Sequence, residues 1–484
     1  MTLFKIKVNG EESLRTKLTT VLDQHRPFAE ATPFWQEGRR LKQFLYQPAQ
    51  FPACPVAPVE LYRPLDAPAT LFLWCHPAVQ KDVLSVLQTL FGERSITDCS
   101  HHLGRIRLRG ARSLAVLQHC LTTNDALWHR LQAVPGAVNS LPPDATLSLL
   151  VQRMKETTEK KKDAMPPRPT AGGVEDMLAV AQLGLQWPAD ANRLSTQVWA
   201  LTASGRQPPP LHKKPRLEEE KETPILITRV TDGWDVILAR DQVYPLWKKL
   251  ALAGGRVVGL DAQRTWAFHH HRGLVWSDGA GCASSGYSTY ADRIGTALQA
   301  KYDATPPAKR VHYARHGVSS PFKIDWAGLS PKPVTLLRHP AHVAFLTAAH
   351  EKWAFLVPVY LETERGVPED RAMLYLDLHE KEKEDKVNQD EDVEDPALLA
   401  VLRDEKVTPK ALSLASEPTL IGYVTTGHYS LSDGAGTGIG LVLHHVFTSP
   451  QTSSVAVKWR NVQDVDYKTG RLHRIKEDHW LEDD

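Results

Sequence analysis

Residues 70–75 read Thr-Leu-Phe-Leu-Trp-Cys and are followed, from Pro77 onward, by apolar residues at helical spacing. Residues 105–110 read Arg-Ile-Arg-Leu-Arg-Gly and are followed by leucines at helical spacing. The first run is continuously apolar, which predicts a buried strand, and Pro77 suits the first turn of a helix. The second run alternates charged and apolar residues, as a half-buried strand does. A strand followed by a helix, twice, predicts an α/β or α+β architecture.

Strand-like patterns resume after residue 223. The runs at 224–230 and 233–238 predict strands, and the helix after them is expected to end at Gly254-Gly255, where glycine takes the left-handed cap conformation. A further strand is predicted at 256–260. Four runs in the last third of the chain predict a mostly β domain: 353–360, 372–376, 420–425 and 438–443.

Composition places the chain among folded proteins. Its 484 residues are 42% apolar and 24% charged, which is typical of globular proteins. No apolar run reaches 18 residues and no secretory signal is recognisable, so we expect an intracellular protein without a membrane partner. Nine acidic and three basic residues lie between Glu380 and Asp395, and the last eight residues are also acidic, so the rest of the chain is basic.

The common catalytic motifs are absent. There is no Gly-x-Ser-x-Gly elbow, H-E-x-x-H helix or P-loop, and the alternating glycines from Gly434 to Gly440 favour a hairpin or a close backbone approach over a phosphate loop. Tandem histidines on a strand point to opposite faces, and the five cysteines form no C-x-x-C pair. We therefore predict no catalytic residues, no metal site and no cofactor.

Three basic clusters suit RNA. Arg105, Arg107 and Arg109 alternate on one strand face about 6–7 Å apart, close to the spacing of neighbouring phosphates. The alternative is a strand face whose arginines pair with carboxylates of the same chain. The other two clusters place cations beside aromatic rings, as RNA-contacting surfaces do. The candidate RNA-binding residues are Arg105, Arg107, Arg109, Arg112, Lys309, Arg310, Tyr313, Arg315, Lys458 and Arg460.

Several short motifs, in order, resemble the large "processing of precursors" subunit family of RNase P and RNase MRP. Leu71 to Pro77 is similar to the family's W-x-H-P segment, and Leu103 to Gly110 is similar to N-R-F-R-L-x-G. Segments from Thr223 to Leu260 and from Lys301 to Phe322 resemble the opening and close of the POPLD domain. Leu420 to Ser430 is similar to the C-terminal G-F-V-T-x-G-x-F-S motif.

The resemblance implies an α+β fold with mixed α/β lobes like those of the glycine-cleavage T-protein and a β-rich C-terminal domain. The expected parts are an extension (1–40), a first lobe (41–154), a partly disordered linker or insertion (155–222), a POPLD-like domain (223–330), a β-rich domain (331–476) with an acidic loop (about 379–396), and an acidic tail (477–484).

The resemblance further implies a noncatalytic, RNA-binding scaffold in the nucleus and nucleolus that supports tRNA 5′ maturation and pre-rRNA processing. Its expected partners are RNase P RNA or RNase MRP RNA, the other protein subunits and, indirectly, pre-tRNA. Nothing like the family's basic N-terminal region precedes Leu41, so we expect a shortened homologue or an incomplete gene model. Two alternatives remain: a folate-dependent aminomethyltransferase of the T-protein type, and a protein that binds only other subunits.

Overall fold

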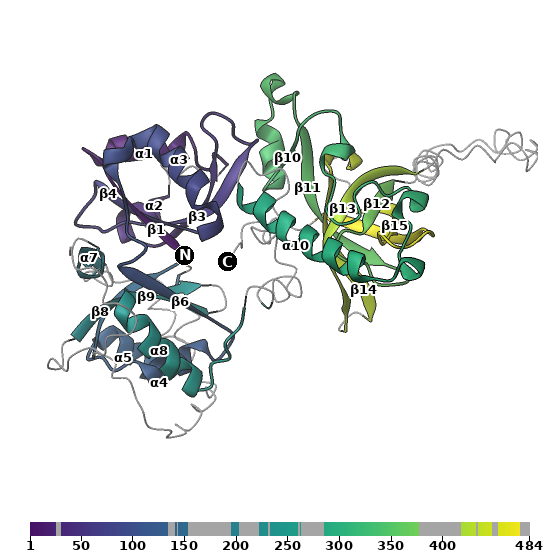
Figure 1. The fold of residues 1–484 in the computed structure, drawn as a ribbon. Helices are drawn as coiled ribbons and strands as arrows, with labels where there is room; N and C mark the ends of the chain where they lie inside the picture. The colour runs from purple at the N-terminus through teal and green to yellow at the C-terminus, as the bar shows by residue number, and fades with distance from the viewer. Residues whose placement is uncertain are drawn as a thin grey trace, which may run out of the picture. The chain divides into compact units, whose positions relative to one another are not determined.

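The structure, a computed structural model, describes residues 1–25, 31–133, 141–142, 144–152, 195–202, 222–230, 233–259, 262, 285–376, 418–431, 434–447 and 454–474. These residues form two compact units (Figure 1). Unit 1 contains residues 1–51 and 56–259, and unit 2 contains residues 52–55 and 260–484. In the described part of the chain, no helix is both long and apolar enough to span a membrane.

The first sheet of unit 1 has the strand order β2-β3-β4-β1-β5. Its strands are β1 (Thr2–Lys7), β2 (Leu41–Tyr46), β3 (Pro55–Tyr62), β4 (Thr70–Cys75) and β5 (Ile96–Asp98). Its helices are α1 (Glu11–Thr19), α2 (Thr32–Glu37) and α3 (Gln80–Phe91). β4 is buried at every position, as its apolar run predicts.

Residues 1–40 are not an extension, contrary to the sequence-based expectation. β1 lies between β4 and β5 and pairs antiparallel with both. Leu3 and Ile6 are fully buried. The short alternating run at 2–7 therefore supplies an inner strand of the sheet, and the first lobe begins at the first residues of the chain.

The second sheet of unit 1 has the order β6-β9-β8-β7. Its strands are β6 (Leu103–Arg109), β7 (Thr146–Gln152), β8 (Glu222–Val230) and β9 (Gly233–Ala239), and all its pairs are antiparallel. The helices of this region are α4 (Ser113–Cys120), α5 (Ala126–Ala133), α7 (Ser195–Ala200) and α8 (Arg240–Leu252).

Alternate residues of the second sheet pack in opposite directions. Ile227 and Val236 contact the layer of α4, α5 and α8, whereas Leu226 and Ile237 pack with Tyr62 of the first sheet. The two sheets of unit 1 thus face each other, with helices on their outer sides (Figure 1).

Two predictions around α8 have different outcomes. The helix ends as expected: Gly254 has a φ of 98° and the Gly255 N–H donates to the Leu250 carbonyl. The strand predicted at 256–260 is wrong for its described part, because residues 256–259 are unpaired and Val257 and Val258 are exposed. An apolar run alone does not provide the neighbouring strand that a sheet needs.

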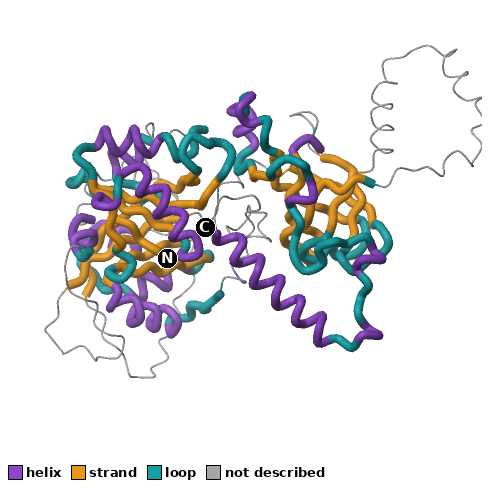
Figure 2. Tube along the Cα trace, turned by 45° about the horizontal axis from the view of Figure 1, so that its top comes forward, coloured by secondary structure: helices purple, strands orange, loops and turns teal. Residues whose placement is uncertain are grey.

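Unit 2 contains a seven-stranded sheet in the order β10-β11-β14-β13-β12-β15-β16, and an additional pairing of β16 with β11 closes it into a barrel. Its strands are β10 (Val334–Leu336), β11 (Ala354–Thr363), β12 (Met373–Leu376), β13 (Thr419–Ser430), β14 (Ala435–Leu443), β15 (Ser454–Arg460) and β16 (Lys468–Arg474). The long helix α10 (Ser285–Ala304) precedes them (Figure 2). The α+β class and the β-rich C-terminal part are confirmed.

The region predicted as one POPLD-like domain, 223–330, is divided between the units. β8, β9 and α8 complete the second sheet of unit 1, whereas α10 and the residues after it pack on the barrel of unit 2. The predicted close approach at the alternating glycines is confirmed, since a Cβ on Gly436 lies 2.1 Å from the Gly366 carbonyl oxygen. Cys54, Cys75, Cys99 and Cys120 are free thiols.

Gly233 begins β9 where no side chain fits. A Cβ at this position lies 1.9 Å from the Leu108 carbonyl oxygen of β6. We expect Gly233→Ala to lower the free energy of unfolding by about 1–3 kcal/mol, because β6 and β9 must separate. Gly10→Ala is the control, since a Cβ there has nothing within 4 Å. Urea unfolding curves measure both, and equal midpoints contradict the prediction.

Candidate nucleic-acid interface

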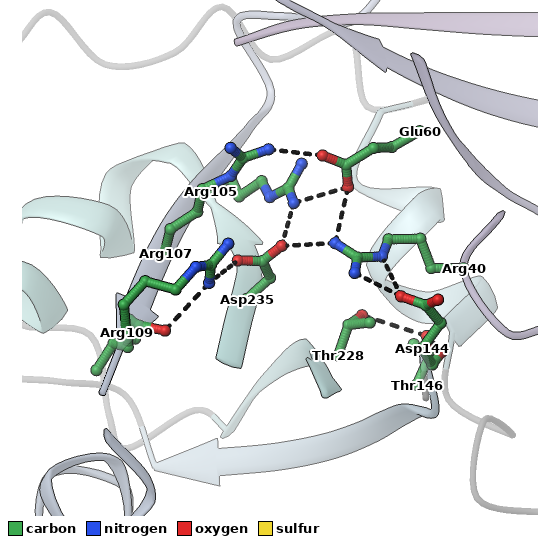
Figure 3. Close-up of polar contacts among 10 residues, drawn as sticks. Arg40, Glu60, Arg105, Arg107, Arg109, Asp144, Thr146, Thr228 and Asp235 are labelled. Carbon is green, nitrogen blue, oxygen red and sulfur yellow. Dashed lines mark hydrogen bonds and ion pairs between the residues drawn. The ribbon is translucent and has the colours of Figure 1, made fainter. Parts of the chain in front are cut away.

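Seven charged side chains meet between the two sheets of unit 1, and we call them the charge cluster (Figure 3). Glu60 comes from β3 of the first sheet, whereas Asp235 of β9 lies opposite Arg107 of β6 in the second. The members are Arg40, Glu60, Arg105, Arg107, Arg109, Asp144 and Asp235. The cluster therefore joins strands of both sheets.

Two carboxylates organise the cluster. One carboxylate oxygen of Glu60 forms ion pairs with Arg105 at 2.7 Å and with Arg40 at 3.0 Å, and the other oxygen pairs with Arg107 at 2.6 Å. Asp235 forms ion pairs with Arg40 at 2.9 Å and with Arg109 at 3.2 Å, and it also pairs with Arg105. Every β6 arginine thus reaches a carboxylate that enters from another strand.

Burial makes these pairs consequential. The side chains of Asp235 and Arg105 are 0% and 1% exposed. Burial alone raises the pKa of a carboxylic acid, but the surrounding guanidinium groups outweigh it and hold the pKa values of Glu60 and Asp235 well below their usual range. Burial, and next the charge of Arg105, lowers the pKa of Arg107. A buried charge that loses its partner here is strongly unfavourable.

The predicted RNA-binding arginines of this region differ in how exposed their side chains are. The three β6 arginines lie on one face, as their spacing predicts, but Arg105 is enclosed by the carboxylates of Glu60 and Asp235, an arrangement that does not favour its predicted phosphate contact. Arg107 and Arg109 keep 25% and 21% of their side chains exposed. Arg112 is half-buried at the turn before α4. The structure thus favours the carboxylate-pairing alternative, most completely at Arg105.

One sequence signal could have revealed this arrangement. Asp235 stands within the otherwise apolar strand Gly233-Trp-Asp-Val-Ile-Leu. An acidic residue on a fully buried strand needs a cationic partner, and the alternating arginines are the matching set. Arg40, by contrast, precedes β2 with no pattern that distinguishes it.

The second cluster lies on short turns after α10. Lys309 belongs to the 3-10 turn Pro307–Lys309, and Arg315 belongs to the turn Tyr313–His316. Both side chains are exposed. Arg310 instead donates to the Thr305 carbonyl at 2.8 Å and to the Asp303 carbonyl at 2.6 Å. It therefore satisfies carbonyls at the end of α10, where a cation is favourable.

Aromatic rings hold these turns. The ring centroids of Tyr302, Tyr313 and Phe322 lie 5.3–5.7 Å apart, and Tyr313 packs against the barrel core. The Tyr302 hydroxyl donates to the Val311 carbonyl at 3.0 Å. Tyr313 and Arg310 thus build the support, whereas Lys309 and Arg315 project from it.

The third cluster is connected to the second. Arg460 at the end of β15 is buried and donates to the His316 carbonyl at 2.8 Å and to the Tyr375 hydroxyl at 3.2 Å. Its guanidinium is thus engaged inside unit 2, where it fixes the chain beside Arg315, and this arrangement does not favour its predicted RNA contact. Lys458 is half-buried on the same strand.

We expect Asp235→Asn to lower the free energy of unfolding by about 3–5 kcal/mol, because it leaves buried guanidinium groups without their carboxylate. Glu37→Gln is the matched control. It removes the 2.5 Å pair with Arg39, which is more exposed, and should cost less than about 1 kcal/mol. Denaturant titration of both variants compares the two losses, and a similar loss in each contradicts a stabilising role for the cluster.

The lowered pKa values set a direction for pH dependence. A carboxylate whose folded pKa lies below its unfolded pKa contributes stability above the unfolded value, and loses it as the pH falls through the folded value. Since the ordinary values are 4.5 for Glu60 and 3.8 for Asp235, unfolding free energy should decline progressively below about pH 4.5. Asp235→Asn should decline less steeply in the same pH series, and an identical slope argues against this assignment.

Comparisons with known proteins agree with the order of the sequence motifs. Residues 233–326 match the POPLD (NUC188) domain, and residues 379–476 match the POP1 C-terminal domain. The chain is 28% identical over 252 residues to the "Ribonucleases P/MRP protein subunit pop1" of Schizosaccharomyces pombe (strain 972 / ATCC 24843). This match covers 48% of the chain and 31% of that relative.

A solved structure, the glycine cleavage system aminomethyltransferase T of Bartonella henselae, aligns with a TM-score of 0.45 and 13% identity over 98% of this chain and 82% of its own. A likeness of this extent carries no function to the chain. The matched family models are POPLD and POP1 domains, and these matches do not favour the aminomethyltransferase alternative. The POPLD domain, the POP1 C-terminal domain and the yeast relative thus agree in one respect: the chain contains domains of the Pop1 type and is similar to a Pop1 protein.

Proposed function

We propose that this chain is a noncatalytic, RNA-binding scaffold subunit of the RNase P or RNase MRP ribonucleoprotein. The yeast relative is named as a protein subunit of ribonucleases P and MRP, and the matched POPLD region contains the turns that present Lys309 and Arg315. The observation that carries the proposal is this pair of exposed cations on turns whose backbone is fixed by Arg310, Arg460 and an aromatic cluster.

The chemistry suits a phosphate backbone. Lys309 offers a mobile ammonium group and Arg315 a planar guanidinium that can contact two phosphate oxygens. Because Arg310 and Tyr313 are already engaged in the support, the exposed cations can bind RNA without dismantling it. Contacts of this type position an RNA and make its affinity dependent on salt.

Unit 1 supplies a second set of candidate contacts in this proposal. Arg107 and Arg109 are anchored to carboxylates on one side and reach solvent on the other, and Arg112 remains a candidate for RNA contact, as does Lys458 of unit 2. An anchored guanidinium loses less conformational entropy when it binds a phosphate than a free one does. These residues are better suited to hold a fixed RNA shape than to capture a flexible strand.

In this role the chain organises the catalytic RNA and other protein subunits, and it supports tRNA 5′ maturation and pre-rRNA processing in the nucleus and nucleolus. It contacts pre-tRNA only indirectly. No cofactor belongs to this proposal. Among the described residues, no group of three or more His, Cys, Asp or Glu side chains is placed to hold a metal ion.

The test is affinity purification of the tagged full chain from its source cells, followed by RNA sequencing. RNase P or MRP RNA should be enriched. In vitro, Lys309→Ala with Arg315→Ala should weaken binding to that RNA several-fold and reduce the salt slope by about two, one for each lost phosphate contact. Lys81→Ala, an exposed lysine on α3, is the matched control and should leave both quantities unchanged.

Two results contradict the proposal. Recovery of neither RNA removes the ribonucleoprotein assignment. Recovery of the RNA with an unchanged affinity and salt slope in the double variant removes the proposed contact at Lys309 and Arg315. Unfolding curves of the variants should match the parent chain, because both side chains are exposed.

A further inference from the structure

An unusual apolar surface lies on and after α8. Of the twelve exposed large hydrophobic side chains in the described part of the chain, five fall within residues 244–258. They are Tyr244, Trp247, Leu252, Val257 and Val258. We call this set the α8 surface. A folded protein seldom concentrates exposed apolar groups without a partner that covers them.

The geometry of α8 explains which side is exposed. Leu246 and Leu250 pack into the core beneath the helix, whereas Tyr244 and Trp247, three residues apart, are exposed. Tyr244 is 54% exposed and Trp247 is 41% exposed. They stack on each other with centroids 6.0 Å apart and planes 22° apart. The pair is therefore a preformed aromatic ridge.

Four cations belong to the same segment as this ridge. Arg240 and Arg256 are exposed at the two ends of the segment, and Lys248 and Lys249 are half-buried on the helix. Asp241 is the only acidic residue in the sequence between Arg240 and Arg256. A surface with an apolar centre and a positive rim fits a partner with apolar side chains and negative charge.

We propose that the α8 surface docks an acidic, amphipathic segment of a partner protein. Tyrosine and tryptophan are the side chains that most often anchor protein interfaces. The aliphatic members decide against RNA as the occupant, because Leu252, Val257 and Val258 offer no ring for a base to stack on. A second copy of the chain in a symmetric pair places like charges of the two rims together. The identity of the partner as another subunit of the particle rests on the proposed function.

The experiment uses the full chain in its source cells. A photo-reactive p-benzoylphenylalanine in place of Leu252 reports what covers the surface, and the same group in place of the exposed Gln299 on α10 is the control. The cross-linked peptide is then sequenced. We expect a peptide of another protein with net negative charge and apolar residues three or four positions apart, obtained from position 252 and absent at position 299.

A variant separates docking from folding. Tyr244→Ser combined with Trp247→Ser should reduce the cross-link yield at position 252 at least tenfold, because it removes the aromatic anchors. Arg256→Glu should reduce it several-fold through repulsion of the acidic segment. Both variants should keep the unfolding midpoint of the parent chain, since the changed side chains are exposed.

Each other outcome overturns the inference. A cross-link to RNA, to a second copy of the chain, to a peptide without negative charge, or to nothing excludes the proposed occupant. An undiminished yield in the aromatic double variant excludes the anchor role of Tyr244 and Trp247. RNA recovered in the same purification is measured separately. Its absence with an intact acidic cross-link contradicts the proposed function alone, and its presence without the cross-link contradicts this inference alone.

Discussion

The carboxylate of Asp235 is the constraint on which unit 1 depends. It is wholly buried between two sheets and is compensated by guanidinium groups from Arg40, Arg105 and Arg109, while Glu60 enters from the facing sheet to complete the cluster. An ion withdrawn from water costs several kcal/mol unless its partners are correctly placed. The charge cluster therefore stabilises one arrangement of the strands strongly relative to any in which a partner is missing.

This constraint changes how a basic sequence is interpreted. The arginines of β6 support the fold first, and only Arg107 and Arg109 retain surface for a further anion. Unit 2 follows the same principle with carbonyl partners. Arg310 and Arg460 hold the chain around exposed Lys309 and Arg315, so the cations that bind carbonyls fix the backbone and the exposed ones remain available for a ligand.

The proposed surfaces differ in the chemistry they offer. Lys309 and Arg315 present charge on rigid turns, which suits a phosphate backbone. The ridge of Tyr244 and Trp247 presents apolar area with cations at its margin, which suits a protein segment. The proposed scaffold role uses both kinds of surface, one for an RNA and one for a neighbouring protein.

Local patterns in the sequence determined β4, β6 and the end of α8 at Gly254, because each depends on residues adjacent in the chain. The alternating glycines indicated a close backbone approach at Gly436, but not its partner Gly366, which is distant in the chain. The ordered motifs also indicated the family. Only the tertiary structure decided that residues 1–40 contribute an inner strand, that 256–259 do not form one, and that Arg105 is paired with Asp235, 130 residues away. Strand neighbours and buried charge partners come from distant parts of the chain, so the periodicity of one segment does not encode them.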